Sequence, residues 1–467
     1  MPRVERDFLG ELELPPTAYY GIQTARAMHN FQISGQPLSS YPELIKALAA
    51  VKLAAARTNM ELGLLDEKPG RVICETALEI MGGALLDQFP VDVIQGGAGT
   101  STNMNINEVI ANRTLEIMGR AKGDYEFCHP NNHVNRSQST NDVYPTAFRL
   151  ALFWALGGLM EHMAYLQAGF EDKALEYADA LKMGRTQLQD AVPMTVGQQF
   201  GAYATTVGED ICRVEEARRL VLEINLGATA IGTGVNSHPD YAALVVRHLA
   251  EITGLPLVLS PNLIEATWDT GAYVQISGVL KRFAVKLSKI CNDLRLLSSG
   301  PRTGINEINL PPRQPGSSIM PGKVNPVIAE VVNQVAFDIV GKDVTITMAA
   351  EAGQLELNVM EPIIAHSLFS GIGRLGRAAR TLMDLCIKDL TVNRERCREM
   401  VMNSIGLITV LAPRLGYETA SALAKEALTV NIPVYDFLLS KNVLPQAVLD
   451  ELMSPEHMIS PWAEPKS

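Results

Sequence analysis

The residues best suited to chemistry lie together in one short stretch, residues 315–326. This stretch reads Pro-Gly-Ser-Ser-Ile-Met-Pro-Gly-Lys-Val-Asn-Pro, and its three prolines and two glycines exclude a continuous helix or strand. It offers two adjacent hydroxyls, Ser317 and Ser318, followed by the cation Lys323 and the amide Asn325. Donors and a positive charge suit a carboxylate, and one hydroxyl could act as a base once activated. The alternative is a solvated connection between helices in which these side chains only form turns.

Three further polar clusters have similar chemistry. Residues 92–107 place three glycines before a dense group of hydroxyls and amides, residues 137–142 precede a long expected helix, and residues 184–193 separate two expected helices. A helix N-terminus with free amides and hydroxyls binds anions, although the same residue types are also the preferred helix caps. The glycines of the first cluster give little support to a phosphate loop, because no Lys-Ser or Lys-Thr follows them. The candidate ligands in these clusters are Thr100, Ser139, Thr140, Asn141, Thr186 and Gln187.

Neither a metal site nor a cofactor site is expected. The six cysteines are scattered, with no CxxC pair and no neighbouring histidine pair, which is typical of free thiols in a reducing compartment. Of the eight histidines, His133 lies closest to a polar cluster, and a lone histidine is more often structural than catalytic. There is no defensible Ser-His-Asp arrangement and no dinucleotide-binding fingerprint. A catalytic site in this chain would therefore rely on hydroxyl, amide and ammonium groups.

Length and composition narrow the class of protein. With 467 residues the chain can form two or three domains, and 47% hydrophobic and 19% charged residues are ordinary for a globular enzyme. The formal net charge of −11 argues against a nucleic-acid or anionic-membrane partner, since either would need a basic face. The N-terminus has no apolar signal segment, and no run of eighteen apolar residues could span a bilayer. We expect a soluble cytoplasmic protein that acts on a small molecule.

Long helices are expected to position the polar clusters. Between residues 271 and 299, apolar side chains recur every three or four positions, as in an amphipathic helix: Ile276, Leu280, Phe283, Leu287, Ile290 and Leu294. Comparable runs cover residues 43–63, 145–178, 195–224, 327–350 and 360–387. Strand signals are few, so the predicted fold class is mainly α, with a central bundle of long helices. Apolar faces this wide exceed what one chain can bury, which predicts further packing between chains.

We expect three domains along the chain. Residues 1–140 mix short helices with loops, and residues 141–392 contain the long helices of the central bundle. Residues 393–467 are divided into shorter segments by turn residues such as Gly416 and Pro433, which is typical of a small separate helical domain. No internal repeat or low-complexity tract interrupts this organisation.

The segment Gly-Ser-Ser-Ile-Met-Pro-Gly-Lys-Val-Asn, residues 316–325, resembles the signature of the aspartase/fumarase superfamily, GSSxMPxKxNP. This motif is specific, and the resemblance extends over essentially the whole chain, from residues 19–21 to the C-terminal domain. One departure is Ala412, where relatives often have asparagine before the residue equivalent to Pro413. It lies outside the motifs and leaves the assignment intact.

Within the superfamily the aspartate ammonia-lyase family is the most similar branch. The similarity is carried by residues 95–101, 184–194 and 358–362. Fumarases usually have histidine in the position of Gln187 and lysine near the position of Glu361. The resemblance therefore implies a lyase that releases ammonia from an amino acid.

The resemblance implies a homotetramer with a multi-helix core and active sites shared between subunits. It also implies a reversible, cofactor-free β-elimination of ammonia from L-aspartate to give fumarate, through an enediolate-type intermediate. Ser317 would be the base, and Asn141 with Gln187 would face the amino group. The other residues would hold the two carboxylates: Thr100, Ser139, Thr140 and Ser318 the β-carboxylate, and Thr186, Lys323 and Asn325 the α-carboxylate.

Such chemistry explains why these residue types are needed. The Cβ proton of aspartate is very weakly acidic, and its removal shifts negative charge onto the β-carboxylate. Preorganised donors stabilise the charge where it develops, and losing one of them typically costs about 3–4 kcal/mol of the activation barrier. Serine is normally too weak a base, so its alkoxide would need stabilisation by Lys323, by loop amides and by exclusion of water. The glycines and prolines of the loop would then be hinges of a closing lid.

Gln187 separates two candidate reactions on physical grounds. Elimination of water needs a proton on a poor hydroxide leaving group, whereas an ammonium group leaves with its own proton and needs no titrating histidine. Two alternatives stay open: a fumarase or a lyase of another amino acid, and a superfamily fold used as a structural or binding protein. The intact Ser317, Lys323 and Asn325 argue against the last, since an unused site would be free to lose them.

Overall fold

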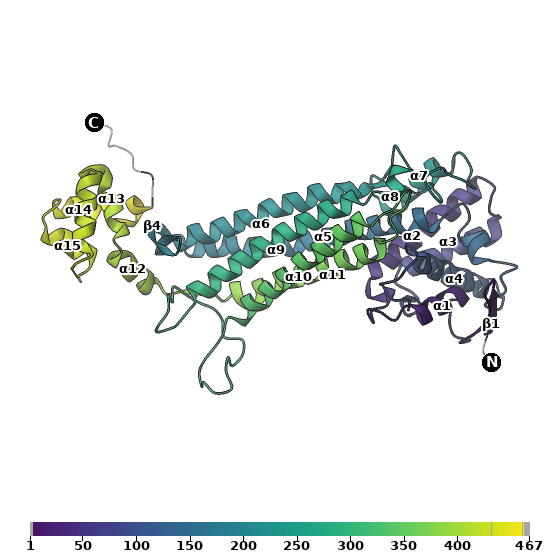
Figure 1. The fold of residues 1–467 in the computed structure, drawn as a ribbon, viewed down its shortest axis with the longest axis horizontal. Coiled ribbons are helices and arrows are strands. Elements are labelled where there is room, and N and C mark those ends of the chain that lie inside the picture. Colours follow the sequence, from purple (N-terminus) through teal and green to yellow (C-terminus); the bar gives the residue numbers. More distant parts are fainter. Residues whose placement is uncertain (1–2, 431, 460, 462–467) are drawn as a thin grey trace. The chain divides into compact units, whose positions relative to one another are not determined.

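A computed structural model describes residues 3–430, 432–459 and 461 of the chain (Figure 1). The described residues are mainly helical, and their strands are short and paired two by two, which confirms the predicted fold class. Packing separates the chain into two compact units. Unit 1 holds residues up to Met160 with Cys212–Arg282 and Phe337–Leu375, and unit 2 holds Glu161–Ile211, Phe283–Ala336 and the residues from Gly376 onward.

Five long helices lie where the periodic runs predicted them, and each contributes residues to both units. They are α5 (Thr140–Glu176), α6 (Val196–Arg218), α9 (Gly271–Leu297), α10 (Val327–Glu351) and α11 (Glu361–Leu382). The six apolar positions expected on α9 are each at most 3% exposed, so the predicted stripe is buried along its whole length. This agreement follows from the 3.6-residue period, which fixes the buried face of a helix once its register is known.

Polar contacts join α9 to α10 within each unit. In unit 1, the carboxylate of Asp343 on α10 accepts a hydrogen bond from Ser277 Oγ at 2.8 Å and pairs with the ammonium group of Lys281. In unit 2, Asn333 Nδ2 on α10 donates to Ser288 Oγ at 2.8 Å. These contacts fix the register between the two helices that precede and follow the loop of residues 315–326.

Unit 1 also contains the N-terminal elements. Its strand β1 (Arg3–Asp7) pairs antiparallel with β2 (Gly10–Leu14), and β5 (Glu223–Ile224) pairs parallel with β6 (Val258–Leu259). Helix α4 packs against α1, α2 and α3, and α2 also packs against α7. The helices are α1 (Ile22–Asn30), α2 (Pro42–Glu61), α3 (Glu67–Met81), α4 (Thr100–Ile117), α7 (Tyr241–Thr253) and α8 (Glu265–Trp268).

The polar cluster at residues 184–193 forms a β-hairpin in unit 2, which the sequence did not indicate. Strand β3 (Leu181–Thr186) pairs antiparallel with β4 (Gln189–Thr195). The turn consists of Gln187 and Leu188, whose φ angles are 54° and 63°. Two successive left-handed residues give the tight turn that matches the twist of a hairpin, and it is usually formed by Asn-Gly or Asp-Gly. Because neither turn residue is glycine, asparagine or aspartate, the usual hairpin signal is missing.

The C-terminal helices of unit 2 have a hydrophobic core of their own. Its fully buried members include Leu407, Leu411, Leu438 and Val401, which are all 0% exposed. The helices are α12 (Arg394–Asn403), α13 (Gly406–Leu415), α14 (Tyr417–Ala427), α15 (Val434–Ser440), α16 (Gln446–Leu452) and α17 (Pro455–Met458), and β7 (Ile308–Asn309) pairs with β8 (Thr391–Val392). The units cut across the three expected domains, and the three-domain division stays a prediction.

Helix α5 is long and apolar enough to cross a membrane by length and composition alone. However, 67% of its apolar window is buried inside the structure. A helix that is apolar on most sides and covered by protein is typical of the core of a large fold. It is the one helix with these properties among the described residues.

All six cysteines lie within the described residues, and all are free thiols, as the sequence indicated. Cys212 is exposed and Cys74 is half-buried, whereas the other four are buried. Burial raises the pKa of Cys128, Cys386 and Cys397 to about 12. Buried thiols with raised pKa values react slowly, because the thiolate is the reactive form.

Candidate active site

The segment between α9 and α10 contains residues 315–326 and extends away from the helices of unit 2 (Figure 1). Within it, Ser317 Oγ accepts hydrogen bonds from the backbone amides of Ile319 at 3.2 Å and Met320 at 3.1 Å. Amides that donate to an oxygen favour its anionic form. The local backbone therefore favours the alkoxide that a serine base would need.

Backbone contacts hold the two ends of this loop together. The amide of Gly316 donates to the carbonyl of Lys323 at 2.7 Å, and Asn325 Nδ2 donates to the carbonyl of Gly316 at 2.8 Å. A Cβ on Gly316 would lie 2.8 Å from the Lys323 carbonyl oxygen, so this close approach requires glycine. The side chains of Ser318 and Lys323 are exposed. The loop thus presents a hydroxyl and an ammonium group to solvent on a closed backbone frame.

In unit 1 the N-termini of α4 and α5 are joined by a side chain. Thr100 is the first residue of α4, and Thr140 is the first residue of α5. Asn103, one turn into α4, donates from Nδ2 to Thr140 Oγ1 at 3.1 Å. Thr100 is exposed, whereas Thr140 is 9% exposed. Neighbouring helix N-termini with hydroxyl side chains form an anion-binding arrangement, because free amides and helix dipoles favour negative charge.

Asp142 fixes the start of α5. Its buried carboxylate accepts hydrogen bonds from the backbone amides of Ser139 at 3.0 Å, Gly227 at 3.1 Å and Thr229 at 2.9 Å. Burial raises the pKa of Asp142 to about 6, and these amides act in the opposite direction. The residue therefore holds Ser139 before the first turn of α5 and attaches the segment around Gly227 to the same place.

Asn141 is oriented by the same segment. Its side-chain Nδ2 donates to the backbone carbonyl of Ala230 at 2.7 Å. Its backbone carbonyl accepts a hydrogen bond from Asn225 Nδ2 at 3.0 Å. With Nδ2 engaged in this way, Oδ1 is the part of the amide left to accept. An acceptor oxygen is what a substrate ammonium group needs.

A buried ion triad links the hairpin to the segment that leads into the Ser317 loop. Glu307 precedes β7 and is 1% exposed, with Oε1 at 2.6 Å from Arg185 Nη1 and Oε2 at 2.9 Å from Lys182 Nζ. Both cations lie on β3, the strand that ends at Thr186. Thr186, the last residue of β3, and the turn residue Gln187 are both exposed, and they lie at one end of a strand that the buried carboxylate holds at Lys182 and Arg185.

Glu307→Gln is expected to destabilise the protein by about 3 kcal/mol, because it leaves the buried Lys182 and the half-buried Arg185 without their counter-charge. The free energy of unfolding, measured with denaturant, checks this. Glu67→Gln is the matched control, since Glu67 pairs with Arg71 on an exposed helix surface and its loss should change stability by less than about 0.5 kcal/mol. Equal, small effects of both substitutions would show that the triad contributes nothing.

The ten candidate residues fall into three groups in the structure. Among the described residues of unit 2, no hydrogen bond joins the hairpin turn to the Ser317 loop. The groups are Thr100, Ser139, Thr140 and Asn141 at the starts of α4 and α5, Thr186 and Gln187 at the hairpin turn, and Ser317, Ser318, Lys323 and Asn325 in the loop.

Several residues that organise these groups were not singled out by the sequence. Asn103 lies inside the first polar cluster, and Asp142 directly follows Asn141, but their roles depend on contacts with distant segments. Glu307 has no local signal, because its partners precede it by more than one hundred residues. Lys52 does have a local sequence signal, because it is a lone cation in the run Leu-Ala-Ala-Val-Lys-Leu-Ala-Ala-Ala. In the structure this lysine is 0% exposed.

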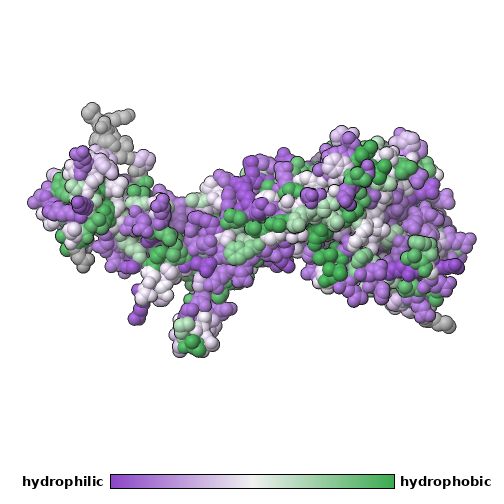
Figure 2. Space-filling view, in the orientation of Figure 1, coloured by the Kyte–Doolittle hydropathy of each residue, from purple (hydrophilic) through white to green (hydrophobic). Residues whose placement is uncertain are grey.

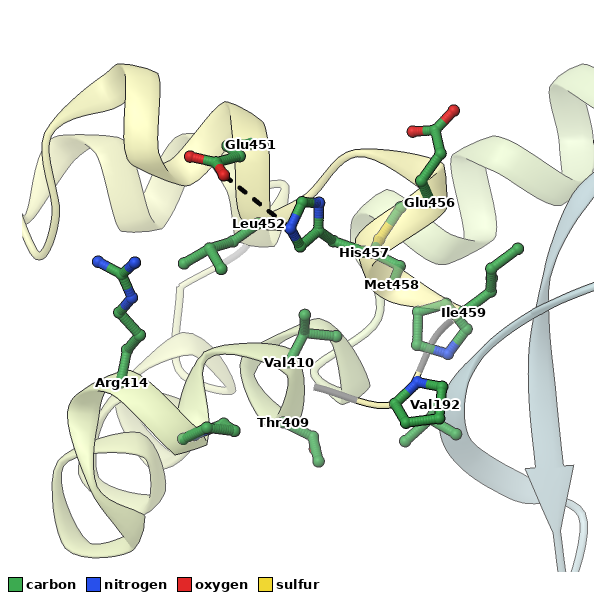
Figure 3. A pocket seen from close by; sticks show the side chains of 13 residues that line it. Val192, Thr409, Val410, Arg414, Glu451, Leu452, Glu456, His457, Met458 and Ile459 are labelled. Atoms are coloured by element: carbon green, nitrogen blue, oxygen red, sulfur yellow. Dashed lines mark ion pairs between the residues drawn. The ribbon is translucent and has the colours of Figure 1, made fainter. Parts of the chain in front are cut away.

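Two cavities of unit 2 are lined by residues other than the ten candidates. One of about 570 Å³ lies among the C-terminal helices, where Val410 of α13, Leu452 of α16 and Met458 of α17 line it (Figure 3). Glu451 Oε1 and His457 Nε2, two of its lining groups, lie 4.0 Å apart. A second, of about 630 Å³, is lined by Leu188 to Ala191 of the hairpin and by α13 and α14. Neither offers the set of donors that the Ser317 loop presents.

The surface combines hydrophilic areas with hydrophobic patches. In the face seen in Figure 2, hydrophilic residues cover much of the chain and hydrophobic ones gather in patches along the long helices. On α10, within unit 1, Phe337, Val340, Val344 and Met348 are 65%, 37%, 55% and 68% exposed. Their spacing of three or four residues places these side chains on one face of the helix, where they form an uncovered apolar stripe.

Known proteins match this chain over nearly its whole length. A family model described as lyase matches residues 10–341, and one described as fumarase C C-terminus matches residues 407–460. The chain is 58% identical to the aspartate ammonia-lyase of Helicobacter pylori over 461 residues, covering 99% of this chain and 98% of the relative. It is 51% identical to the aspartate ammonia-lyase of Escherichia coli (strain K12) over 460 residues, covering 98% and 96%.

Solved structures match equally well. The structure of a fumarate lyase:delta crystallin from Brucella melitensis bound to cobalt superposes with a TM-score of 0.96 at 52% identity, covering 99% of this chain and 100% of that chain. A recombinant class II fumarase from Schistosoma mansoni superposes with a TM-score of 0.92 at 34% identity, covering 98% and 99%. The fold described above is therefore common to these proteins.

Proposed function

The chain belongs to the lyase family of the aspartase/fumarase superfamily, and we propose that it acts as an aspartate ammonia-lyase, converting L-aspartate reversibly to fumarate and ammonia. The aspartate ammonia-lyases that match it do so along nearly their full length, which makes it a carbon–nitrogen lyase. The observation that carries the reaction type is the Ser317 loop, where two backbone amides donate to the hydroxyl oxygen and Lys323 is exposed nearby in the chain.

The proposed base is Ser317. Its alkoxide would remove a proton from Cβ of aspartate, and the charge would move onto the β-carboxylate as an enediolate before ammonia leaves from Cα. The amides of Ile319 and Met320 support this role, since they stabilise negative charge on Oγ. Closure of the loop over the substrate would exclude water and strengthen the same interactions.

The other candidate residues are proposed as substrate ligands. The starts of α4 and α5 would hold the β-carboxylate, where the enediolate charge develops, through Thr100, Ser139 and Thr140 together with Ser318. Thr186, Lys323 and Asn325 would hold the α-carboxylate, and Asn141 and Gln187 the amino group. The contact of Asn141 Nδ2 with the Ala230 carbonyl supports its part in this assignment, because it leaves Oδ1 as the acceptor of the amide.

We propose a homotetramer with active sites shared between subunits, in the cytoplasm. The apolar stripe on α10 supports assembly, because a stripe of this size is costly to leave in water. The division of the candidate residues among the helix starts, the hairpin and the loop supports sharing, since different chains could contribute different groups. We also propose residues 393–467 as a small separate domain, which the core of its helices supports.

We expect ammonia release from L-aspartate to greatly exceed hydration of fumarate. Gln187 cannot titrate, so it cannot protonate a hydroxide leaving group, whereas ammonium needs no such proton. Fumarate absorbance is followed after adding aspartate and, separately, malate, with ammonia measured in parallel. Efficient malate turnover without ammonia from aspartate would identify a fumarase instead, and no turnover of either would favour a lyase of another amino acid or a protein without activity.

A further inference from the structure

Lys52 on α2 is a fully buried lysine. A single side chain, that of Asn103, connects its ammonium group to Thr140 of the proposed carboxylate site. The side chain is 0% exposed. Its Nζ donates to Asn103 Oδ1 at 2.7 Å, Asn135 Oδ1 at 2.9 Å and Gln138 Oε1 at 2.9 Å. All three ammonium hydrogens are thus used, and each lies on a neutral amide oxygen rather than on a carboxylate.

Burying a cation that has no directly bonded carboxylate costs free energy, because burial disfavours the charged form. This effect lowers the pKa of Lys52 to about 7, and the nearby Asp142 carboxylate acts in the opposite direction. Asp142 is itself held by backbone amides and forms no hydrogen bond to the ammonium group. The charge at Lys52 is therefore only partly neutralised inside the protein, which favours an anion bound close to it.

The ammonium group also determines the orientation of Asn103. Ammonium only donates, so the Asn103 amide must turn its oxygen toward Nζ and its Nδ2 away. Nδ2 then donates to Thr140 Oγ1 at 3.1 Å and to Asn135 Oδ1 at 3.2 Å. Because the Thr140 oxygen accepts this hydrogen bond, its own hydrogen is available for another acceptor.

We propose that Lys52 is a positioning residue of the carboxylate site: through Asn103 it directs the Thr140 hydroxyl hydrogen toward the substrate β-carboxylate, and its buried charge attracts that carboxylate. The proposal depends on the placement of the β-carboxylate at Thr140 under the proposed function. Without the ammonium group, the orientation of the Asn103 amide is held only by its 3.2 Å contact with Asn135 Oδ1 besides Thr140, and the amide can turn over. Its oxygen would then accept the Thr140 hydrogen, and the carboxylate would lose a donor.

A double-mutant cycle between Lys52 and Thr140 tests this role, read as the dissociation constant of succinate by calorimetry. Lys52→Met keeps a long side chain without donors, and Thr140→Val keeps the shape without the hydroxyl. Each alone is expected to weaken succinate binding about tenfold, since each removes a hydrogen bond to a charged group. The double variant should bind hardly more weakly than Lys52→Met, because an undirected Thr140 hydroxyl contributes little.

Proton uptake gives a readout that a merely structural role would not change. Burial lowers the pKa of Lys52 to about 7 in the free protein, and a bound dianion raises this pKa again, so succinate binding near neutral pH should be accompanied by uptake of part of a proton. Asp142 is the charged group that acts on Lys52, and the three contacts of Nζ are neutral amides. Calorimetry in two buffers of different ionisation enthalpy measures the uptake, which should disappear in Lys52→Met.

Lys173→Met is the matched control. Lys173 is also buried, but it lies in unit 2 and contacts Glu176 and the carbonyl of Leu390. This substitution should lower stability while leaving proton uptake intact, and its combination with Thr140→Val should be additive. If Lys52→Met does not fold, Asn103→Leu replaces it in the cycle, because it removes the donor to Thr140 and leaves the ammonium group in place.

The outcomes separate this proposal from the proposed function. If Thr140→Val alone leaves succinate affinity unchanged, the placement of the β-carboxylate fails and the role of Lys52 fails with it. If Thr140→Val weakens binding but the effects of Lys52→Met and Thr140→Val are additive, only the role of Lys52 is wrong. Equal coupling in the Lys173→Met cycle would overturn it as well.

Discussion

Ser317→Ala is expected to lower turnover of aspartate by about 10²–10⁴-fold, the range that a positioned proton-transfer group contributes. Folding and succinate binding should be nearly unchanged, because the substitution frees only the amides of the exposed residues Ile319 and Met320, which water can bond instead. The two contacts that close the loop do not involve the hydroxyl: Gly316 donates to the Lys323 carbonyl, and Asn325 donates to the Gly316 carbonyl. Turnover is followed by fumarate absorbance and binding by calorimetry on the same preparation. The combination of intact binding and lost turnover is specific for a group that acts only in the chemical step.

Two further variants serve as the comparison and the control for Ser317→Ala. Lys323→Ala should weaken succinate binding as well as turnover, because it removes the only cation of residues 315–326. Ser440→Ala should change neither, since the Ser440 hydroxyl donates to a backbone carbonyl among the C-terminal helices. Near-normal turnover in Ser317→Ala would assign the base to another residue. Loss of binding together with turnover would assign Ser317 to the loop structure instead.

Two inactive variants should restore each other's activity. Asn141 lies at the start of α5 in unit 1 and Ser317 lies in the loop of unit 2. If different chains supply these groups to one site, Asn141→Ala and Ser317→Ala chains unfolded and reassembled together form some sites without either defect. Random assortment of equal amounts makes about one quarter of the sites intact, because each group then comes from an unaltered chain half of the time. Activity should rise to about a quarter of wild type, far above either parent.

A second pair of variants is the control for this experiment. Ser317→Ala and Lys323→Ala both alter the same loop, so no mixed assembly contains an intact one, and their mixture should stay inactive. Mass spectrometry of the assemblies confirms that chains have mixed. Mixed assemblies of the Asn141 and Ser317 variants without recovered activity would mean that these residues come from the same chain, or that the site is wrong.

The sequence was sufficient to predict the long helices, but not the structure of the segments between them. The buried stripe of α9 could be predicted because a helix repeats its face every 3.6 residues, so local spacing is enough. The hairpin of β3 and β4 could not, because its turn is made by Gln187 and Leu188 rather than by residues that favour left-handed backbone. Its register is given by the pairing of β3 with β4, and β3 is held by the Glu307 triad; neither has a local sequence pattern.

The candidate site shows the same limit. Motif resemblance supplied its hydroxyls and amides, but Asn103, Asp142 and Lys52 act through segments far apart in the chain. A lysine in an alanine-rich helix is visible in the sequence, yet its three amide partners lie 51 to 86 residues away. Contacts over such distances depend on how α2, α4 and α5 pack, which periodicity alone does not determine.

The distribution of thiols makes the chain suited to single-site fluorescent labelling. Cys212 is exposed on α6, whereas Cys128, Cys291, Cys386 and Cys397 are buried and burial also raises the pKa of the half-buried Cys74. The pKa values of Cys128, Cys386 and Cys397 are raised to about 12. A brief maleimide reaction on the native protein should therefore attach one dye, at Cys212, without any cysteine having to be replaced. If native Asn141→Ala chains carry a donor dye and native Ser317→Ala chains an acceptor before they are mixed, energy transfer reports subunit exchange in the same cuvette that reports fumarate.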